Sequence, residues 1–344
     1  MPQRNWSVCI DTVCAHVVEH YVFPDVAEQI VAVLRQRLAD GGYDPIATDE
    51  EFAAAVTADL QSVNGDKHLR LKHCIDPIPE QHEARLFDEA AYRAEVELSA
   101  GGIAAVRRLD GNVGYLDVRA MHGPAHAGHL AVAAMNLVAH TDALLFDVRR
   151  NGGGHPGMVA LYCSYLFDSA THLNDLYWRD DGSTHQWWTL PYTPGPRFGG
   201  TKPVYVLTSA DTFSGAEELC YNLKTRGRAT LVGERTGGGA NPGGEYRIDT
   251  HLKAAVPSGR AINPVTGTNW EGTGVTPDIE VPADAAFDAA YRLALDHVLA
   301  LPATGPRREV AGEAARARAA LGDQLEVTAG SGAVVVAVKG PTTT

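Results

Sequence analysis

The stretch TSADTFSGAEE, residues 208–218, places a serine where an apolar run meets a predicted helix. One interpretation is N-capping, since a Ser or Thr hydroxyl before an acidic pair commonly accepts hydrogen bonds from the first turn of a helix. The other is that Ser214 is a nucleophile at a strand-to-helix turn, where the N–H of Gly215 could stabilise an oxyanion. This stretch alone does not decide between the two interpretations.

A second unusual stretch, LLFDVRRNGGGHPG (144–157), has three consecutive glycines after a predicted buried strand. Such a run lets backbone N–H groups face an anion, although a tight strand-to-helix turn would look the same. The nucleotide-binding patterns GxxxxGK with Ser or Thr, and GxGxxG with a following acidic residue, do not occur. Both this run and Ser214 lie at the carboxyl ends of predicted parallel strands, so the two turns could enclose one oxyanion.

A serine nucleophile needs a base, because its hydroxyl alone is a weak nucleophile. The stretch GDKHLRL (65–71) offers His68 beside a turn. The chain has 14 histidines, however, and the residues alone do not choose among His68, His155, His172 and His185.

The hydrophobic pattern divides the chain into a helical region and an α/β region. Residues 5–63 place apolar residues at three- and four-residue intervals, which predicts a small helical domain over 1–75, followed by a connector over 76–102. Over 103–302, apolar strands alternate with helices, which indicates a mostly parallel sheet covered on both faces. A linker, a helix and a strand are expected over 303–344. The predicted fold class is therefore α/β with a small N-terminal helical domain.

The segment 175–200 interrupts this alternation and predicts a β-hairpin rich in aromatic residues. It could be a surface loop that covers the core. It could also be a wall of a substrate cleft, lined by Trp187, Trp188 and Tyr192, because such excursions often lie beside sites on a rigid scaffold.

Composition excludes several classes of protein. The formal net charge is −13 and no block of Lys or Arg occurs, which argues against nucleic acid or an anionic membrane as a partner. The first thirty residues lack the plan of a secretory signal and no segment has the length of a membrane span, so we expect a cytoplasmic protein. The five cysteines are scattered without a CxxC pair, which favours neither disulfides nor structural zinc.

Several stretches in order along residues 12–300 resemble the tail-specific, or C-terminal processing, serine protease family. They are HYVFPDVAEQI, ADLQSVNGDKHLRL, GYLDVRAM, LLFDVRRNGGGHP, the long run from YVLTSADTFSGAEEL to GERTGGGANPGG, and GTNWEGTGVTPDIEVP. The similarity is greatest to the branch that contains interphotoreceptor retinoid-binding protein, with the tricorn protease core as a catalytic relative. The resemblance implies a sheet of the crotonase-like ββα superhelix type.

The resemblance also implies roles for single residues. Ser214 would be the nucleophile, and the N–H groups of Gly215 and of a glycine in the run 152–154, Gly153 above the others, would form the oxyanion hole. Many members use a lysine base shortly after a GE-T motif, but Gly239 occupies that position here. Tricorn-like members use a histidine and a glutamate instead, which correspond to His68 and Glu271.

In the tricorn plan a serine just before the histidine links it to the glutamate, and this sequence has Lys67 there. No metal or organic cofactor is implied. No PDZ-like segment is evident, so substrate would be held by the cleft itself, with Trp187, Trp188 and Arg197 as candidate contacts.

The resemblance thus predicts a serine peptidase that acts on peptides or proteins near a carboxyl terminus. Two alternatives stay open: a retinoid- or fatty-acid-binding module without catalysis, and a hydrolase of a non-peptide ester or amide. Oligomerisation is possible, but no signal in the sequence indicates it.

Overall fold

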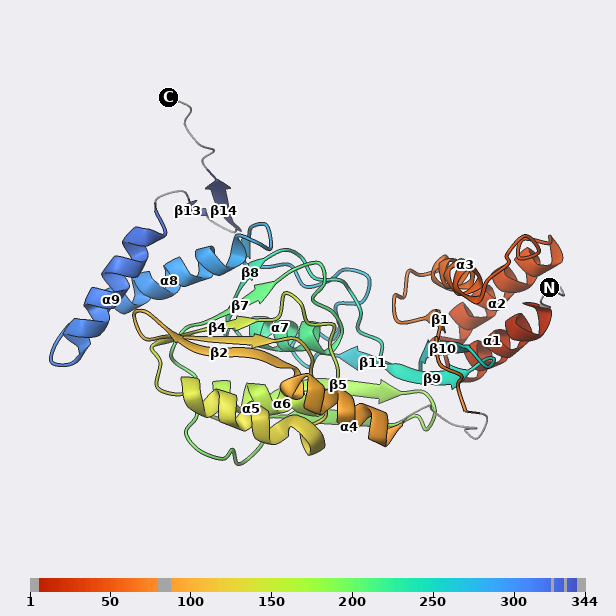
Figure 1. Cartoon of the computed structure of the whole chain (residues 1–344), viewed down its shortest axis with the longest axis horizontal. Helices are drawn as coiled ribbons and strands as arrows, with labels where there is room; N and C mark the ends of the chain where they lie inside the picture. The colour runs from red at the N-terminus through yellow and green to blue at the C-terminus, as the bar shows by residue number, and fades with distance from the viewer. Residues whose placement is uncertain (1–5, 80–87, 323–324, 331–332, 339–344) are drawn as a thin grey trace, which may run out of the picture. The chain divides into compact units, whose positions relative to one another are not determined.

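The computed structural model describes residues 6–79, 88–322, 325–330 and 333–338 (Figure 1). The chain forms two compact units. An N-terminal unit contains residues up to 89 together with 175–186 and 239–262, and an α/β unit contains 90–174, 187–238 and the residues from 263 onward. The sequence analysis assigned 175–186 and 239–262 to the α/β region, whereas in the structure they belong to the N-terminal unit.

Three helices and a small sheet build the N-terminal unit. The helices are α1 (Trp6–His20), α2 (Pro24–Ala39) and α3 (Asp49–Gln61), and the antiparallel sheet has the order β1 (Arg70–His73), β10 (Leu252–Pro257), β9 (Gly243–Arg247). Pro24 opens α2, and Thr48 caps α3 by accepting a hydrogen bond from the Glu51 N–H. Proline and a capping hydroxyl are ordinary helix starts.

The core of this unit joins the helices to the distant β9–β10 hairpin. Apolar residues from both are buried in one cluster, including Ile10, Val13, Leu34, Phe52, Leu60, Leu71, Tyr246, Leu252 and Val256. Trp6 stacks on Phe52 with ring centroids 4.0 Å apart. The helices therefore bury their apolar faces partly against a strand pair that follows them by about two hundred residues in the chain.

An eight-stranded sheet forms the centre of the α/β unit, in the order β13-β14-β12-β8-β7-β4-β3-β2. The inner strands β3 (Val113–Val118), β4 (Ala143–Asp147), β7 (Val204–Thr208), β8 (Thr230–Gly233) and β12 (Ile279–Glu280) are parallel to one another. β2 (Ile103–Leu109) is antiparallel to β3, and at the other edge β14 (Ala333–Val338) is antiparallel to β13 (Leu325–Gly330). The sequence prediction of a mostly parallel sheet is confirmed.

Helices cover both faces of this sheet (Figure 1). α5 (Pro124–Val138), α6 (Pro156–Leu166) and α7 (Gly215–Thr225) pack side by side on one face, and α8 (Ala286–Ala300) with α9 (Arg307–Ala320) lies over the other. Side chains along β4 alternate between the two layers: Leu145 belongs to the cluster under α8, whereas Phe146 meets Tyr162 of α6 edge-on at 5.1 Å. This two-sided burial explains the continuous apolar runs of the inner strands.

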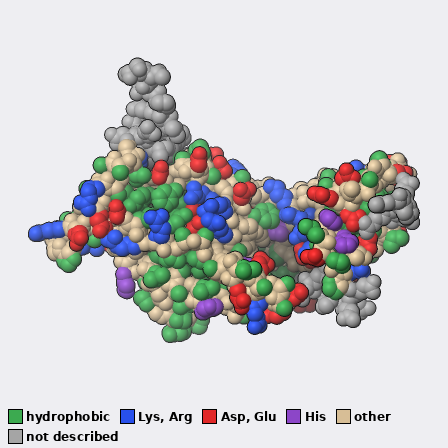
Figure 2. Space-filling view, in the orientation of Figure 1, with side chains coloured by type: hydrophobic (Ala, Val, Ile, Leu, Met, Phe, Trp, Pro, Cys, Tyr) green, Lys and Arg blue, Asp and Glu red, His purple; other side chains and the backbone are tan. Residues whose placement is uncertain are grey.

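The aromatic segment forms a hairpin, as predicted. β5 (His172–Trp178) and β6 (Thr184–Trp188) lie in a three-stranded sheet with β11 (Gly259–Ile262), in the order β11-β5-β6. The connector predicted over 76–102 contains α4 (Glu89–Leu98) and a short 3₁₀ turn at Ala100–Gly102, and its residues 80–87 lie outside the described part of the chain. On the face shown in Figure 2, basic and acidic side chains are interspersed over each unit.

Within the described ranges, no helix combines the length and the apolar composition needed to cross a lipid bilayer.

A buried polar cluster lies beneath α7. Glu218 is buried, and this burial raises the pKa of its carboxyl group to about 8. Among the residues that the structure describes, Oε1 of Glu218 and both amide atoms of Asn174 have no hydrogen-bond partner. A carboxyl group in such surroundings is stable mainly in its neutral, protonated form.

We therefore expect the protein to lose stability as the pH rises from about 5 to about 8. Over this range the folded chain keeps a proton on Glu218 that the unfolded chain, with an ordinary carboxyl pKa, has released, so the free energy of unfolding falls by up to about 1.4 kcal/mol per pH unit. Urea unfolding of wild type and Glu218→Gln across this range compares their free energies of unfolding. The value for wild type should fall as the pH rises, whereas the value for Glu218→Gln, which has no carboxyl group at this position, should change much less. Exposed Glu50→Gln serves as the control, and parallel pH profiles for wild type and Glu218→Gln would contradict the expectation.

Candidate active site

The predicted site residues are divided between the two units. Ser214, Gly215, Gly153 and Glu271 belong to the α/β unit, and His68 belongs to the N-terminal unit. In each unit, local contacts hold the predicted site residues that the unit contains.

Ser214 occupies a strained turn between β7 and α7. Its backbone has φ 53° and ψ −121°, a conformation that residues with a side chain rarely adopt. Thr48, an ordinary cap in the same chain, has φ −122° and ψ 154° and accepts a bond from Glu51 N. Capping requires only the extended conformation of Thr48. The left-handed backbone of Ser214 costs on the order of 1–3 kcal/mol and is typical of functional sites, so it favours the nucleophile interpretation.

The carboxylate of Glu217 holds this turn in place. One oxygen accepts a hydrogen bond from the Ser214 N–H (2.9 Å), and the other accepts bonds from the Thr236 hydroxyl (2.5 Å) and the Gly238 N–H (2.7 Å). Glu217 is fully buried, so these donors replace the water that the carboxylate would otherwise bind. The sequence suggested only a capping role for this acidic pair, whereas Glu217 also ties the turn to the loop after β8.

The glycine run lies directly against the serine. A Cβ atom added to Gly153, whose φ is 104°, would lie 2.6 Å from Cβ of Ser214 and 2.7 Å from the Gly215 nitrogen. A Cβ on Gly154 would overlap the carbonyl of Met121. The two turns predicted to share one edge of the sheet are thus in contact, and the contact requires glycine.

Asn151 fixes the glycine run, a role that the sequence analysis did not assign. Its buried side chain donates to the Val118 carbonyl (3.0 Å) and accepts the Gly153 N–H (2.8 Å), while its carbonyl accepts the Phe213 N–H (3.0 Å). Asn directly before a glycine run is a signal for such a turn, because its short side chain can bond to the backbone two residues later.

Among the described residues, the backbone N–H groups of Gly215 and Gly154 are candidate donors to an oxyanion. The N–H of Gly215 is at the start of α7, where the helix dipole favours negative charge. Gly153, predicted as the second donor, already donates its N–H to Asn151. Within the described residues, the N–H of its neighbour Gly154 makes no hydrogen bond, and it lies 3.0 Å from the position of a Cβ on Gly215.

Glu271 lies in a loop that is anchored to the same helix. The preceding Trp270 is buried and packs against Tyr221 of α7, with ring centroids 5.3 Å apart. The Gly272 N–H donates to the Gly238 carbonyl (3.1 Å), and the Glu271 N–H donates to the side chain of Asn269 (2.9 Å). The loop after β8 and the α7 helix therefore hold both Ser214 and Glu271 in the α/β unit.

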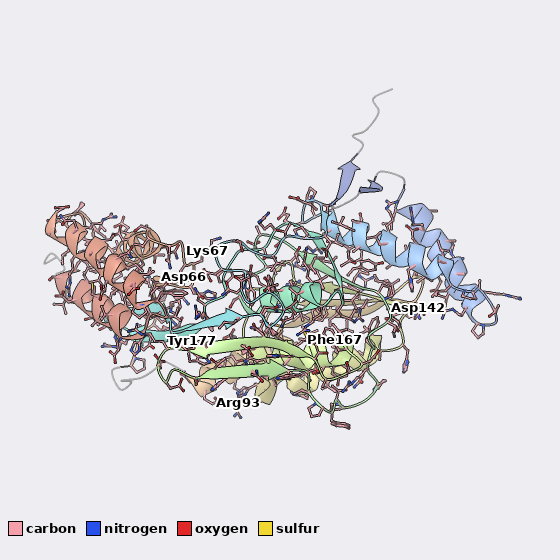
Figure 3. All side chains as sticks on the ribbon, turned by 180° about the vertical axis from the view of Figure 1, so that it is seen from behind. Asp66, Lys67, Arg93, Asp142, Phe167 and Tyr177 are labelled. Carbon is pink, nitrogen blue, oxygen red and sulfur yellow. The ribbon has the colours of Figure 1, made fainter. Side chains whose placement is uncertain are left out.

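In the N-terminal unit, Asp66 shapes the turn that carries His68 (Figure 3). Asp66 is fully buried; one carboxylate oxygen accepts the His68 N–H (3.0 Å), and the other accepts the Tyr21 hydroxyl (3.0 Å) and the Asn241 amide (2.9 Å). The sequence analysis did not single out Asp66, although an Asp two residues before the histidine is a turn signal. Lys67, between the two, is exposed.

The imidazole of His68 is held in its neutral form. Burial, followed by the nearby cations Arg70 and Lys72, lowers the pKa of His68 to about 4. A histidine with such a pKa is unprotonated at neutral pH and is able to accept a proton, which a general base requires.

The predicted substrate contacts differ in their surroundings. Trp188 is 45% exposed and stacks on His172 (4.6 Å), while Trp187 is more buried and meets His155 edge-on at 6.1 Å. Arg197 donates through Nε to the Thr193 hydroxyl and through its other nitrogens to the carbonyls of Phe167 and Leu190. These bonds tie the Arg197 guanidinium to its own loop and to the end of α6, which argues against the predicted contact of Arg197 with substrate.

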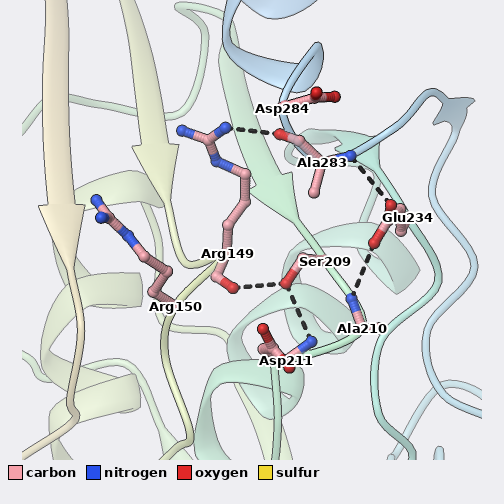
Figure 4. A pocket seen from close by; sticks show the side chains of 8 residues that line it. All are labelled: Arg149, Arg150, Ser209, Ala210, Asp211, Glu234, Ala283 and Asp284. Atoms are coloured by element: carbon pink, nitrogen blue, oxygen red, sulfur yellow. Dashed lines mark hydrogen bonds between the residues drawn. The ribbon is translucent and has the colours of Figure 1, made fainter.

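A polar pocket of about 380 Å³ opens at the carboxyl ends of the parallel strands (Figure 4). It is lined by Arg149, Arg150, Ser209, Ala210, Asp211, Glu234, Ala283 and Asp284. Ser209 is a poor nucleophile candidate, because its hydroxyl donates to the Arg149 carbonyl and accepts the Asp211 N–H. Both arginines are paired, Arg149 with buried Asp147 (2.6 Å) and Arg150 with Asp117 (2.8 Å). Ser214 does not line this pocket.

A strained serine at a helix start, beside glycine backbone, is the arrangement of a serine hydrolase. Two family descriptions match the chain: "Peptidase family S41" over residues 112–281, and "N-terminal domain of Peptidase_S41 in eukaryotic IRBP" over residues 3–98. Together they cover most of the sequence. The chain belongs to peptidase family S41 and is a serine-type peptidase, which confirms the resemblance found in the sequence.

Solved structures share this fold at low sequence identity. A candidate peptidase from Parabacteroides merdae is 18% identical with a TM-score of 0.59, and the alignment covers 83% of this chain and 96% of that one. A candidate S41 protease from Bacteroides fragilis is 15% identical (TM-score 0.54; 90% and 97% covered). The tricorn protease is 14% identical (TM-score 0.51), with 90% of this chain aligned to 36% of the tricorn chain.

The contact between Gly153 and Ser214 leads to a matched pair of variants. Gly153→Ala should lower the free energy of unfolding by on the order of 2–4 kcal/mol, because the added methyl group overlaps the serine turn and the backbone is left-handed. Gly152→Ala should change it little, since no atom lies within 4 Å of the added Cβ. Urea unfolding measures both, and equal losses for the two variants would contradict the geometry.

Proposed function

We propose that this peptidase hydrolyses peptides near their carboxyl termini, with Ser214 as nucleophile, His68 as general base and Glu271 as a supporting carboxylate. The observation that carries the proposal is the strained backbone of Ser214, held by Glu217 at the start of α7 and packed against the glycine run. A nucleophile on such a turn projects from the end of the sheet toward substrate.

The chemistry follows from the groups in each half. Ser214 Oγ attacks the scissile carbonyl carbon while His68 takes the hydroxyl proton. The oxyanion that forms accepts hydrogen bonds from the N–H groups of Gly215 and Gly154. We prefer Gly154 to Gly153 as the second donor because the Gly153 N–H already donates to Asn151. The intermediate then expels the amine, which takes the proton from His68, and water hydrolyses the acyl-enzyme by the same steps in reverse order.

The assignment of the base rests on two features of the sequence and the structure. Gly239 replaces the lysine that many relatives use. The low pKa of His68 keeps its imidazole unprotonated at neutral pH, and the turn around Asp66 fixes its backbone. The mechanism requires the N-terminal unit to present His68 to Ser214 during turnover.

Labelling with a fluorophosphonate tests the nucleophile and the base. The reagent should modify Ser214 in the wild-type protein, as located by mass spectrometry, because an activated serine attacks phosphorus. Ser214→Ala should lose the label, and His68→Ala should be labelled at least 100-fold more slowly, the usual minimum contribution of a general base. His185→Ala, which removes an exposed imidazole, should be labelled like wild type. Unchanged labelling of His68→Ala would exclude His68 as the base.

The preference for carboxyl termini is tested separately with matched peptides. We expect faster cleavage of a peptide with a free terminal carboxylate than of the same peptide with a terminal amide, measured as kcat/KM. Equal rates for the two peptides would show an internal peptidase, and cleavage of simple esters alone would show a non-peptide substrate.

A second candidate function, binding of a retinoid or fatty acid, is favoured by one observation. Trp188, Leu190 and Tyr192 are exposed apolar side chains close together in sequence, with Tyr192 73% exposed. Exposed aromatic surface of this kind is a common feature of ligand and partner sites. This function would be supported if the folded protein is not labelled by the fluorophosphonate and its tryptophan fluorescence is quenched on titration with a fatty acid.

A further inference from the structure

The last turns of α1 carry three metal-ligating side chains that the proposed function does not use. His16, Glu19 and His20 each offer one ligand atom, and these atoms all lie within 4.8 Å of one another. The spacing i, i+3, i+4 places the three side chains on one face of the helix. All three belong to the N-terminal unit, and Figure 2 shows histidine and acidic side chains together on the surface of that unit.

The separation of the ligand atoms suits a small divalent ion. Zinc binds histidine nitrogen and carboxylate oxygen at about 2.0–2.2 Å, so two ligands at the tetrahedral angle lie about 3.4 Å apart. Nε2 of His20 and Oε2 of Glu19 are 3.7 Å apart. A small rotation of the exposed Glu19 side chain would bring both atoms within bonding distance of one ion.

The surroundings orient the two imidazole rings. Both pack against Tyr246 of β9, His16 with centroids 4.8 Å apart and His20 with centroids 4.4 Å apart and ring planes inclined by 8°. Asp180 Oδ1 is 3.7 Å from Nδ1 of His20, the ring nitrogen opposite the one that faces Glu19. A carboxylate behind a ligating histidine fixes its tautomer and strengthens its metal bond.

An unsatisfied nitrogen gives an independent indication of a missing ligand. Nδ1 of His16 is buried, and within the described part of the chain it has no hydrogen-bond partner. Ring stacking alone would explain the contact with Tyr246, but it requires neither Glu19 nor Asp180.

We propose that His16, Glu19 and His20 bind a divalent transition-metal ion, zinc above the others, with Asp180 as the partner of His20. Two imidazoles and one carboxylate are a donor set typical of zinc, and they leave a fourth position for water. The bound ion would join α1 to the stacked Tyr246 and to the turn that holds Asp180, and would stabilise the N-terminal unit. The site contains none of the residues proposed for peptide hydrolysis.

Metal binding to the full chain, purified without a histidine tag and stripped with EDTA, tests the proposal. Titration with Co²⁺ should give the visible absorption of a tetrahedral site with one ion per chain, and Zn²⁺ should displace it and raise Tm. His16→Ala and His20→Ala should each weaken Zn²⁺ binding at least tenfold by calorimetry. His129→Ala, which removes an exposed histidine of α5, should leave binding unchanged.

Glu19→Gln and Asp180→Asn keep the result interpretable if a histidine variant fails to fold, because both residues are exposed and should not disturb packing. We expect weaker Zn²⁺ binding in both, with an unchanged Tm in EDTA. Absence of saturable binding to the wild type, or equal binding by wild type and all four site variants, would overturn the proposal. Variants that lower Tm equally with EDTA and with Zn²⁺ would also overturn it, since the stack would then be packing alone.

Discussion

The hydrogen bonds of one buried carboxylate are the constraint on which the candidate site depends. Glu217 accepts bonds from the Ser214 backbone, the Thr236 hydroxyl and the Gly238 backbone, and so joins the nucleophile turn to the loop after β8. The Thr236 hydroxyl in turn accepts the Val275 N–H (2.7 Å), which extends the connection to the loop that follows Glu271. Without Glu217, three backbone or hydroxyl donors would lose their acceptor, and the left-handed serine would lose a compensating interaction.

The parallel sheet determines which loops can meet this carboxylate. β4 and β7 are neighbours in parallel register, Leu144 opposite Val204 and Asp147 opposite Leu207, so the loops after them emerge side by side. Asn151 uses this proximity to bond the first loop to the second, and glycine at 153 permits the close approach. The strain at Ser214 is therefore balanced by Glu217 of its own helix together with contacts from the loop that follows β4.

Much of this organisation could be predicted from the sequence, because the signals were local. Continuous apolar runs identified the inner strands, apolar spacing identified the N-terminal helices, and the two glycine-bearing turns were expected at one sheet edge. The membership of 243–257 in the N-terminal core could not be predicted, since it depends on packing between residues far apart in the chain. The same holds for Arg197, because one of its three acceptors is the Phe167 carbonyl at the end of α6, thirty residues earlier in the chain. Which glycine N–H is available depends on the rotamer of Asn151, and single-sequence patterns carry no rotamer information.

The shared core of the N-terminal unit has an evolutionary consequence. Its helices bury Ile10, Val13 and Leu34 in the same cluster as Tyr246, Leu252 and Val256, which the chain supplies only after most of the α/β unit has been synthesised. During translation the apolar faces of the helices therefore stay partly uncovered until the β9–β10 hairpin has been synthesised. A gene fusion or deletion that exchanged the first ninety or so residues as a block would leave both pieces with exposed apolar surface. The first ninety or so residues are therefore not a self-contained structural module, even though the helices are contiguous in the sequence.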